Sequence, residues 1–317
     1  MKVHGGTATG GIADDAFAMP AGMAIRYDRP SPDLADCITG YTVFHSDDPV
    51  ERVDWFLPSP TMLCIFVEAG PVTARIGNHA FGPLPPATVI GPTSRAMRIT
   101  THGGTMVGIG ISATGWARMT DASASLSHNR IVAAETVFDP AAVAMLTRQL
   151  AALPDDRTVK LVLDALLPAL LRPVPAGTKG AHMALIAQLT ALATTDCVID
   201  VADIAVRLGV AEARLRRLSR QYFGMPPKQL LRRARFLRSF VRLFQGGDIA
   251  DARRLDPSYF DMSHYLRDAN AFLGTTPRRF LGHNSPFLQA SIRARMAVLG
   301  APTQALHPGG CKVPPAG

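Results

Sequence analysis

The chain has 317 residues, of which 47% are apolar and 18% charged, and its formal net charge is +8. This length suits two domains, and this apolar content supports a sizeable core, which excludes a wholly disordered chain. The longest apolar stretches, such as residues 62–67 and 162–171, fall well short of the roughly 18 residues that a membrane span requires. No membrane partner is therefore expected.

The N-terminal end and the cysteines indicate a cytoplasmic protein. Met1 and Lys2 are followed by glycines, threonines and aspartates rather than by the apolar segment of a signal peptide. Residues 1–22 show no periodicity and are expected to form a flexible tail. No two cysteines form a Cys-x-x-Cys pair, which argues against a zinc site or a disulfide framework. The four cysteines are Cys37, Cys64, Cys197 and Cys311.

Residues 23 to about 112 have the pattern of short β-strands. The apolar run 62–70 is closed by Gly70–Pro71, and residues 72–82 alternate around Gly77–Asn78, a pair that suits a type II′ hairpin turn. Further short runs lie at 87–92, 95–101 and 104–112. Strands at spacings near ten residues predict a small barrel or sandwich.

After Ala113 the apolar residues recur at helical spacing. Segments 139–153 and 158–171 each carry a wide apolar stripe, which indicates either a dimer interface, the interpretation that we favour, or helices that cover the β-domain. A Pro/Gly-rich linker at 172–180 marks the domain boundary. Residues 181–283 are expected to be helical, and residues 284–317 to form an extension with one helix at 286–299.

The positive charge is concentrated in one quarter of the chain. Residues 201–282 hold 16 of the 33 basic residues and 7 of the 25 acidic ones, so this segment carries +9 and the remainder −1. All but one of these 16 basic residues are arginines, whose planar forks suit bidentate contacts to phosphate or guanine. The segment is therefore the candidate for binding a polyanion.

Residues 201–224 have the spacing of a helix–turn–helix. Ala202, Ala205, Val206 and Leu208 form the apolar face of a short helix, and Gly209 supplies the turn, because glycine adopts positive φ freely. Leu215 and Leu218 recur on the inner face of a second helix, the one expected to read the major groove. The residues that this helix exposes are Ala213, Arg214, Arg216, Arg217 and Arg220.

A long connecting helix is predicted from Pro226–Pro227 to Gly246–Gly247, and a second reading unit at 248–281. Asp261 is placed to cap the reading helix of this second unit. Tyr265, Ala269 and Phe272 are expected to face inward. The residues expected to face outward are Met262, Ser263, His264 and Arg267.

Residues 181–283 resemble the DNA-binding domain of the AraC family of transcription regulators. The resemblance rests on "DIAVRLGV…LRRLSRQYFGMPPKQLLRRARF" and "YFDMSHYLRDANAFLGTTPRRFL", and covers about a third of the chain. Residues 23–171 resemble more loosely the cupin-like effector and dimerisation domain of many members, through "VIGPTSRAMRI" and "MVGIGIS". The resemblance implies an α+β chain, with a small N-terminal cupin-like β-barrel plus helices and an all-α double helix–turn–helix domain.

The resemblance also implies partners and site residues. The partners are promoter DNA, a second copy of the chain, a small-molecule effector and, for an activator, RNA polymerase. Phosphate contacts are expected from helix N-termini and from Arg220, Arg233 and Arg279. The base-reading positions of the two units are Ala213, Arg214, Arg216 and Arg217, and Met262, Ser263, His264 and Arg267.

Three departures from the family pattern affect the reading units. Ala211 stands where a serine usually caps the first reading helix, which should cost about 0.5–2 kcal/mol. Ser258 follows Pro257 where the family prefers glycine, and Ala269 replaces a bulky aromatic, a loss of about 3–5 kcal/mol in a packed core unless neighbours fill the gap. The second unit is therefore expected to be looser than the first, or to contact mainly the DNA backbone.

Effector-binding candidates lie on or beside the predicted strands. An arginine that points into the barrel would favour an acidic effector. The candidates are Trp55, Phe66, Arg75, Arg95 and Arg98.

Two other classes of function are alternatives. A non-specific or architectural DNA binder would share the basic surface but have no preferred site at physiological salt. A cupin-type metalloenzyme needs clustered ligands, whereas His45, His79 and His102 are isolated. The chain also has no nucleophile elbow and no phosphate loop. We therefore expect no catalytic residues, no metal and no cofactor. The function that we expect is that of a sequence-specific DNA-binding regulator.

Overall fold

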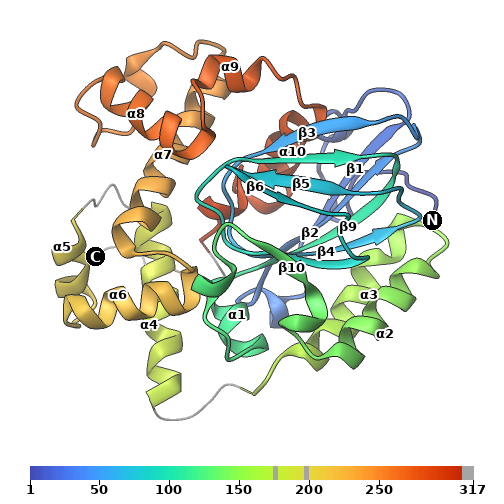
Figure 1. The fold of residues 1–317 in the computed structure, drawn as a ribbon, viewed down its shortest axis with the longest axis horizontal. Coiled ribbons are helices and arrows are strands. Elements are labelled where there is room, and N and C mark those ends of the chain that lie inside the picture. The colour runs from blue at the N-terminus through green and yellow to red at the C-terminus, as the bar shows by residue number, and fades with distance from the viewer. Residues whose placement is uncertain (174–177, 196–199, 309–317) are drawn as a thin grey trace.

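The computed structural model describes residues 1–173, 178–195 and 200–308. Figure 1 shows a β-rich N-terminal part beside a helical part, with the last long helix returning to the strands. The chain is thus α+β, as the sequence predicts. Cys197 and Cys311 lie outside the described residues, while Cys37 and Cys64 are buried free thiols.

Within the described ranges, ten strands form two antiparallel sheets. Their bounds are β1 Met23–Asp28, β2 Ile38–Ser46, β3 Arg52–Phe56, β4 Met62–Val67, β5 Thr73–Ile76, β6 His79–Phe81, β7 Ala87–Ile90, β8 Met97–Thr101, β9 Gly104–Ile111 and β10 Ile131–Ala133. The six-stranded sheet has the order β1-β2-β9-β4-β7-β10, and the four-stranded sheet β3-β8-β5-β6. The turn at Gly77, whose φ is 57°, joins β5 to β6 as predicted.

The two sheets do not close into the small barrel that the resemblance implies. No edge strand of one sheet pairs with an edge strand of the other among the described residues. Instead the sheets meet through side chains, in a cluster where Ile76 and Ile99 of the smaller sheet pack with Cys64 and Ile90 of the larger. The domain is a sandwich, the alternative that strand spacing alone left open.

Helices cover the other face of the larger sheet. The α-helices of this part are α1 Ala113–Met119, α2 Pro140–Ala151 and α3 Val159–Leu166. Val143, Leu146 and Leu163, from the predicted apolar stripes, are buried together with Leu63 and Val107 of the sheet. The stripes therefore cover the sheet within a single chain, which is the interpretation that we did not favour.

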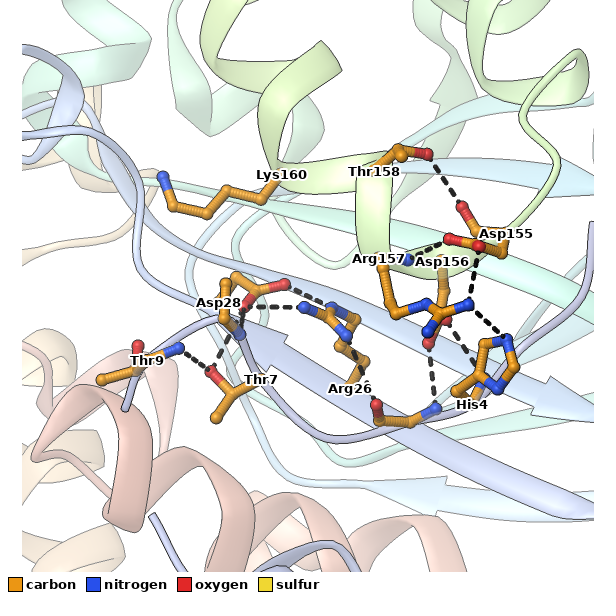
Figure 2. Close-up of polar contacts among 12 residues, drawn as sticks. His4, Thr7, Thr9, Arg26, Asp28, Asp155, Asp156, Arg157, Thr158 and Lys160 are labelled. Carbon is orange, nitrogen blue, oxygen red and sulfur yellow. Dashed lines mark hydrogen bonds and ion pairs between the residues drawn. The ribbon is translucent and has the colours of Figure 1, made fainter. Parts of the chain in front are cut away.

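Residues 1–22 are not a loose tail. The backbone N–H groups of His4 and Gly5 donate to buried Asp156, at 3.1 and 2.9 Å, and that of Ala8 donates to Asp28 (Figure 2). Asp28 is itself paired with Arg26 at 2.6 Å. Hydrogen bonds to carboxylates are stronger than neutral ones, so two buried aspartates hold the N-terminal segment against the sandwich.

The second part of the chain is helical. Its helices are α4 Thr178–Thr195, α5 Val201–Arg207, α6 Glu212–Phe223, α7 Pro227–Gln245, α8 Met262–Leu273, α9 Pro277–Leu281 and α10 Pro286–Leu299. Short 3-10 helices are η1 Asp14–Phe17, η2 Pro32–Leu34, η3 Ala124–Ser127, η4 Ala134–Thr136, η5 Asp156–Thr158, η6 Leu167–Leu170, η7 Ala252–Arg254 and η8 Gln304–Leu306. No helix within the described residues is long and apolar enough to cross a membrane.

The C-terminal extension joins the two parts. Helix α10, predicted at 286–299, leaves the helical domain and packs on β1 and β3 (Figure 1). Phe287 stacks on Phe44 with ring centroids 4.8 Å apart. The hydroxyl of Ser285, the N-cap of α10, donates to Asp54 of β3 at 2.7 Å. The extension therefore belongs structurally to the sandwich.

Candidate nucleic-acid interface

The first helix–turn–helix forms as the sequence predicts. Asp200 caps α5 by accepting a hydrogen bond from the N–H of Ala202. Gly209 has a φ of 61°, and the next N–H, of Val210, bonds the carbonyl of Ala205 at 3.0 Å. Leu215 and Leu218 of α6 are buried against α5. One inward residue differs: Val206 is 80% exposed, and Ile204 occupies the core in its place.

The outer face of α6 is basic and open. Ala213, Arg216, Arg217 and Arg220 are all exposed and recur every three to four residues, so they share one face. Arg216 pairs with Glu212 one turn earlier on the same helix. The helix begins at Ala211 without a side-chain cap, as the sequence predicts.

Arg214 lies to one side of this face and is half-buried near His182 of α4. Burial, together with the charges of Arg214 and Arg217, lowers the pKa of His182. His182 is therefore neutral near pH 7, which leaves the positive charge of this region to the arginines.

Four of the arginines of α7 serve the fold rather than a ligand. Arg232 and Arg235 pair with Asp268 of α8, at 2.5 and 2.6 Å, and Arg238 pairs with Asp256 at 2.9 Å. Arg233 is only 3% exposed. The concentration of positive charge in this segment therefore overstates the charge available at its surface.

A phosphate contact by Arg233 is incompatible with this arrangement. Its Nη1 donates to the carbonyls of Ser59 and Thr93 in the sandwich, at 3.1 and 2.9 Å. Burial lowers the pKa of Arg233 to about 10. This side chain joins α7 to the N-terminal domain.

The second unit lacks a full first helix. Only the 3-10 turn η7, Ala252–Arg254, precedes α8. Asp261 caps α8 as predicted, accepting from the N–H of His264 at 2.6 Å. Ala269 is fully buried, and the aromatic cluster beside it includes Phe236, which stacks on Phe272 at 5.3 Å.

Asp268 holds α8 on α7. Besides its two arginines, it accepts a hydrogen bond from the hydroxyl of Tyr259 at 2.8 Å. Burial alone would raise the pKa of Asp268, but the hydrogen bonds from Arg232, Arg235 and Tyr259 outweigh burial and lower it. The guanidinium of Arg235 also lies 4.2 Å from the centre of the Tyr259 ring. The ion pairs and hydrogen bonds of the buried Asp268 carboxylate therefore hold the second unit in place.

The outer face of α8 differs from the predicted one. Ser263 and Arg267 are exposed as expected, and Met262 is half-buried. His264 turns inward: its Nε2 lies 3.3 Å from Nη2 of Arg235, and its ring packs edge-on against Tyr259. These contacts engage the His264 side chain within the fold, so it is less available for reading bases than Ser263 and Arg267.

Other exposed residues near α8 complete this surface. Leu266 and Asn270 share the outer face with Arg267, and sequence reasoning missed them because neither is basic. Phe260, just before α8, is 94% exposed. Arg279 is exposed at the start of α9, where Thr276 caps the N–H of Arg279 itself.

The structure does not gather the predicted effector residues into one site. Trp55 stacks on His283 at 4.6 Å and packs on Phe280, so it lies between the two domains. Arg75 and Arg98 face each other across β5 and β8, on the face that alternates with buried Ala74 and Ile76. They therefore point away from the interior of the sandwich.

The remaining two effector candidates lie in separate hollows. Phe66 lines one between the sheets, together with Phe44 and Phe287. Arg95 is exposed at another, beside Gly77 and His128. Within the described residues, no cluster of His, Cys, Asp and Glu side chains suits a metal ion.

Comparison with known proteins gives only distant similarities. No family model matches the chain, and neither does any curated protein. The chain is similar to the solved structure of ToxT from Vibrio cholerae, at 11% identity and a TM-score of 0.42, over 76% of this chain and 97% of that one. It is also similar to the AraC-like transcriptional activator CuxR, at 12% identity and a TM-score of 0.27, over 72% and 83%.

A third similar structure is ToxT from Vibrio cholerae with a bound unsaturated fatty acid, at 10% identity and a TM-score of 0.38, over 75% of this chain and 96% of that one. CuxR bears the name of the family that residues 181–283 resemble. At TM-scores below 0.5, these similarities are too loose to assign a function.

Proposed function

We propose that the protein is a sequence-specific DNA-binding transcription regulator of the AraC type. The observation that carries the proposal is the open face of α6, where Arg216, Arg217 and Arg220 follow a helix–Gly–helix turn. Among the described residues, the Arg216–Glu212 pair is the one bond that these three side chains make. A helix of this kind fits the major groove, and arginine reads guanine by a bidentate contact to O6 and N7.

In this proposal the two units have different tasks. Helix α6 reads bases, with Arg214 at the edge of its reading face. Helix α8 offers Ser263 and Arg267 but no second exposed arginine on the same face. It therefore contacts mainly the DNA backbone, helped by Arg279 at the start of α9.

The test is selection of bound sequences from a random duplex pool by the full-length protein at about 0.15 M salt, a concentration at which purely electrostatic binding is weakened. We expect an enriched motif with at least one G-containing element. Binding without an enriched motif would contradict sequence specificity and favour a non-specific binder. Arg75→Ala is a control variant for this selection, because it removes one exposed arginine from the opposite domain and should enrich the same motif.

A homodimer on two half-sites is a further part of the proposal. Because the apolar stripes of α2 and α3 already cover the sheet, the exposed apolar surface left for pairing there is limited. It includes Leu161, an exposed leucine on α3. Sedimentation of the free protein and of its complex with DNA gives the stoichiometry, and one chain per selected site would contradict the dimer.

A further inference from the structure

A cavity lies between the two sheets, where α10 closes the sandwich. Its volume is about 100 Å³, several times the 10–15 Å³ that a single water requires by the same measure. Its walls are mainly apolar and come from both sheets and from α10. They include Phe44, Met62, Met97, Ile99, Leu288 and Ile292.

One buried charge lines this apolar space. Arg295 of α10 is only 6% exposed. Its Nη2 donates to the carbonyl of Thr39 at 3.2 Å, while its Nε has no hydrogen-bond partner among the described residues. Burial lowers the pKa of Arg295 to about 10, and no carboxylate contributes to that pKa. A buried arginine without an anion is costly for a fold.

Other unpaired polar groups surround the same cavity. Within the part of the chain that the structure describes, the hydroxyls of Ser291 and Thr303 and the side-chain oxygen of Gln304 are buried without partners, and all three residues line the cavity with Arg295. Buried polar atoms are nearly always hydrogen-bonded. Of these residues, Arg295, Ser291 and Thr303 have N–H or O–H groups to donate, and they are therefore suited to the anionic head of a ligand.

We propose that this cavity binds a small monocarboxylate with an apolar body, whose carboxylate accepts hydrogen bonds from Arg295 and the nearby hydroxyls. Among the described residues that line the cavity, Arg295 is the one charged side chain, which suits one negative charge. The apolar walls suit the body of the ligand. The sequence links an acidic effector to an arginine that points into the β-domain, and here that arginine comes from the C-terminal extension rather than from a strand.

The position of α10 gives the site a route to the DNA-binding part; this link rests on the proposed function. Residues 282–285 alone separate α10 from α9 of the second unit. Ser285, at the start of α10, bonds both Asp54 and the N–H of Trp55. Trp55 in turn packs on Phe280 of α9. A ligand that favours one position of α10 would thereby favour one position of the second unit.

The test is calorimetric titration of the full-length protein, without DNA, with hexanoate and 3-phenylpropionate and with the matched alcohols, 1-hexanol and 3-phenylpropan-1-ol. We expect at least one acid to bind about 10–100-fold more tightly than its alcohol, as hydrogen bonds to a charged group imply. Equal binding of acid and alcohol, or no binding of either acid, would overturn the proposal. Because DNA is absent, failure here is distinct from failure of DNA binding.

Variants test whether the acid binds in this cavity. Arg295→Met should abolish the preference for the acid, Arg295→Lys should keep part of it, and Ile292→Phe should weaken acid and alcohol alike by filling the cavity. Arg75→Ala, on the outer face of the smaller sheet, should leave all affinities unchanged. Undiminished acid binding in Arg295→Met would place the acid elsewhere and overturn the proposal. If Arg295→Met does not fold, undiminished acid binding in Ile292→Phe would overturn it equally.

Discussion

In the two helix–turn–helix units the reading helices end in the same way, but the segments that precede these helices differ. Each reading helix ends at a glycine with positive φ, Gly224 at 76° and Gly274 at 75°, and each is followed by a helix that starts at a proline. The first unit has a complete entry helix, α5, but no N-cap on α6. The second has a strong N-cap on α8 but only a 3-10 turn before it.

The arginines of the two units also differ in their surroundings. The arginines of α6 are mostly exposed, whereas Arg232 and Arg235, which face α8, both pair with Asp268. Exposed arginines are available to bind DNA, whereas arginines held in ion pairs inside the protein are not. The comparison indicates that the first unit reads sequence while the second holds the domain together.

The largest expected effect is on the stability of the second unit. Asp268→Ala leaves Arg235 buried without its carboxylate, and breaking a buried pair in this way costs about 3–5 kcal/mol. Urea unfolding of the full-length protein measures the loss. Asp121→Ala is the control, because Asp121 and its partner Arg172 are both exposed, and it should change stability little. Equal stability of the two variants would remove Asp268 as the anchor.

The same carboxylate predicts an acid dependence. Because the pKa of Asp268 is lower in the folded protein than in the unfolded chain, its contribution to stability is complete above the unfolded pKa and is lost as the pH falls through the folded pKa. Unfolding free energy measured from pH 6 down to pH 2 should therefore fall more steeply for the wild type than for Asp268→Asn. Parallel curves would contradict this.

Base reading by the first unit gives the next largest effect. Arg216→Ala and Arg217→Ala should each cost about 1–3 kcal/mol on the selected site, with less cost on unrelated DNA. Fluorescence anisotropy with both duplexes measures the difference. A loss of equal size on both duplexes would make these residues phosphate contacts instead.

Backbone contact by the second unit should have a uniform effect. Arg267→Ala is expected to weaken binding to all sequences alike and to lower the salt slope by about one, because it removes one phosphate contact. Titrations at several salt concentrations give the slope. A change of base preference in this variant would show that α8 reads sequence as well.

The smallest effect tests the missing cap. Ala211→Ser supplies the side chain that caps α6 and should stabilise the protein by about 0.5–1 kcal/mol. Thermal unfolding measures the gain, and Ala271→Ser, on an exposed turn inside α8, is the control that should give none. Lack of any difference between these two variants would mean that other groups already satisfy the start of α6.

Features set by nearby residues could be predicted from the sequence. The Gly209 turn, the uncapped start of α6, the Asp261 cap and the Gly77 hairpin all depend on partners within a few positions. The helices of the DNA-binding part follow from apolar spacing in the same way. Pro257–Ser258 departs from the family pattern and indicated an altered entry to the second unit, but not that a 3-10 turn stands before α8.

Features that depend on contacts between residues far apart in the sequence could not be predicted from it. Arg233 bonds the carbonyl of Thr93, 140 positions away, and Ser285 bonds Asp54, 231 positions away. An arginine-rich helix has the same sequence pattern whether its side chains meet phosphate, aspartate or a carbonyl. For the same reason the sequence did not show that residues 1–22 are held by Asp28 and Asp156, or that Arg295 lines a cavity.

The most direct test of the division between the units is to repeat the random-pool selection with two variants. In the double variant Arg216→Ala/Arg217→Ala, the motif enriched by the wild type should disappear. In Arg267→Ala the same motif should persist at lower overall affinity. Loss of the motif in Arg267→Ala, with its retention in the double variant, would contradict the account and make α8 the reader.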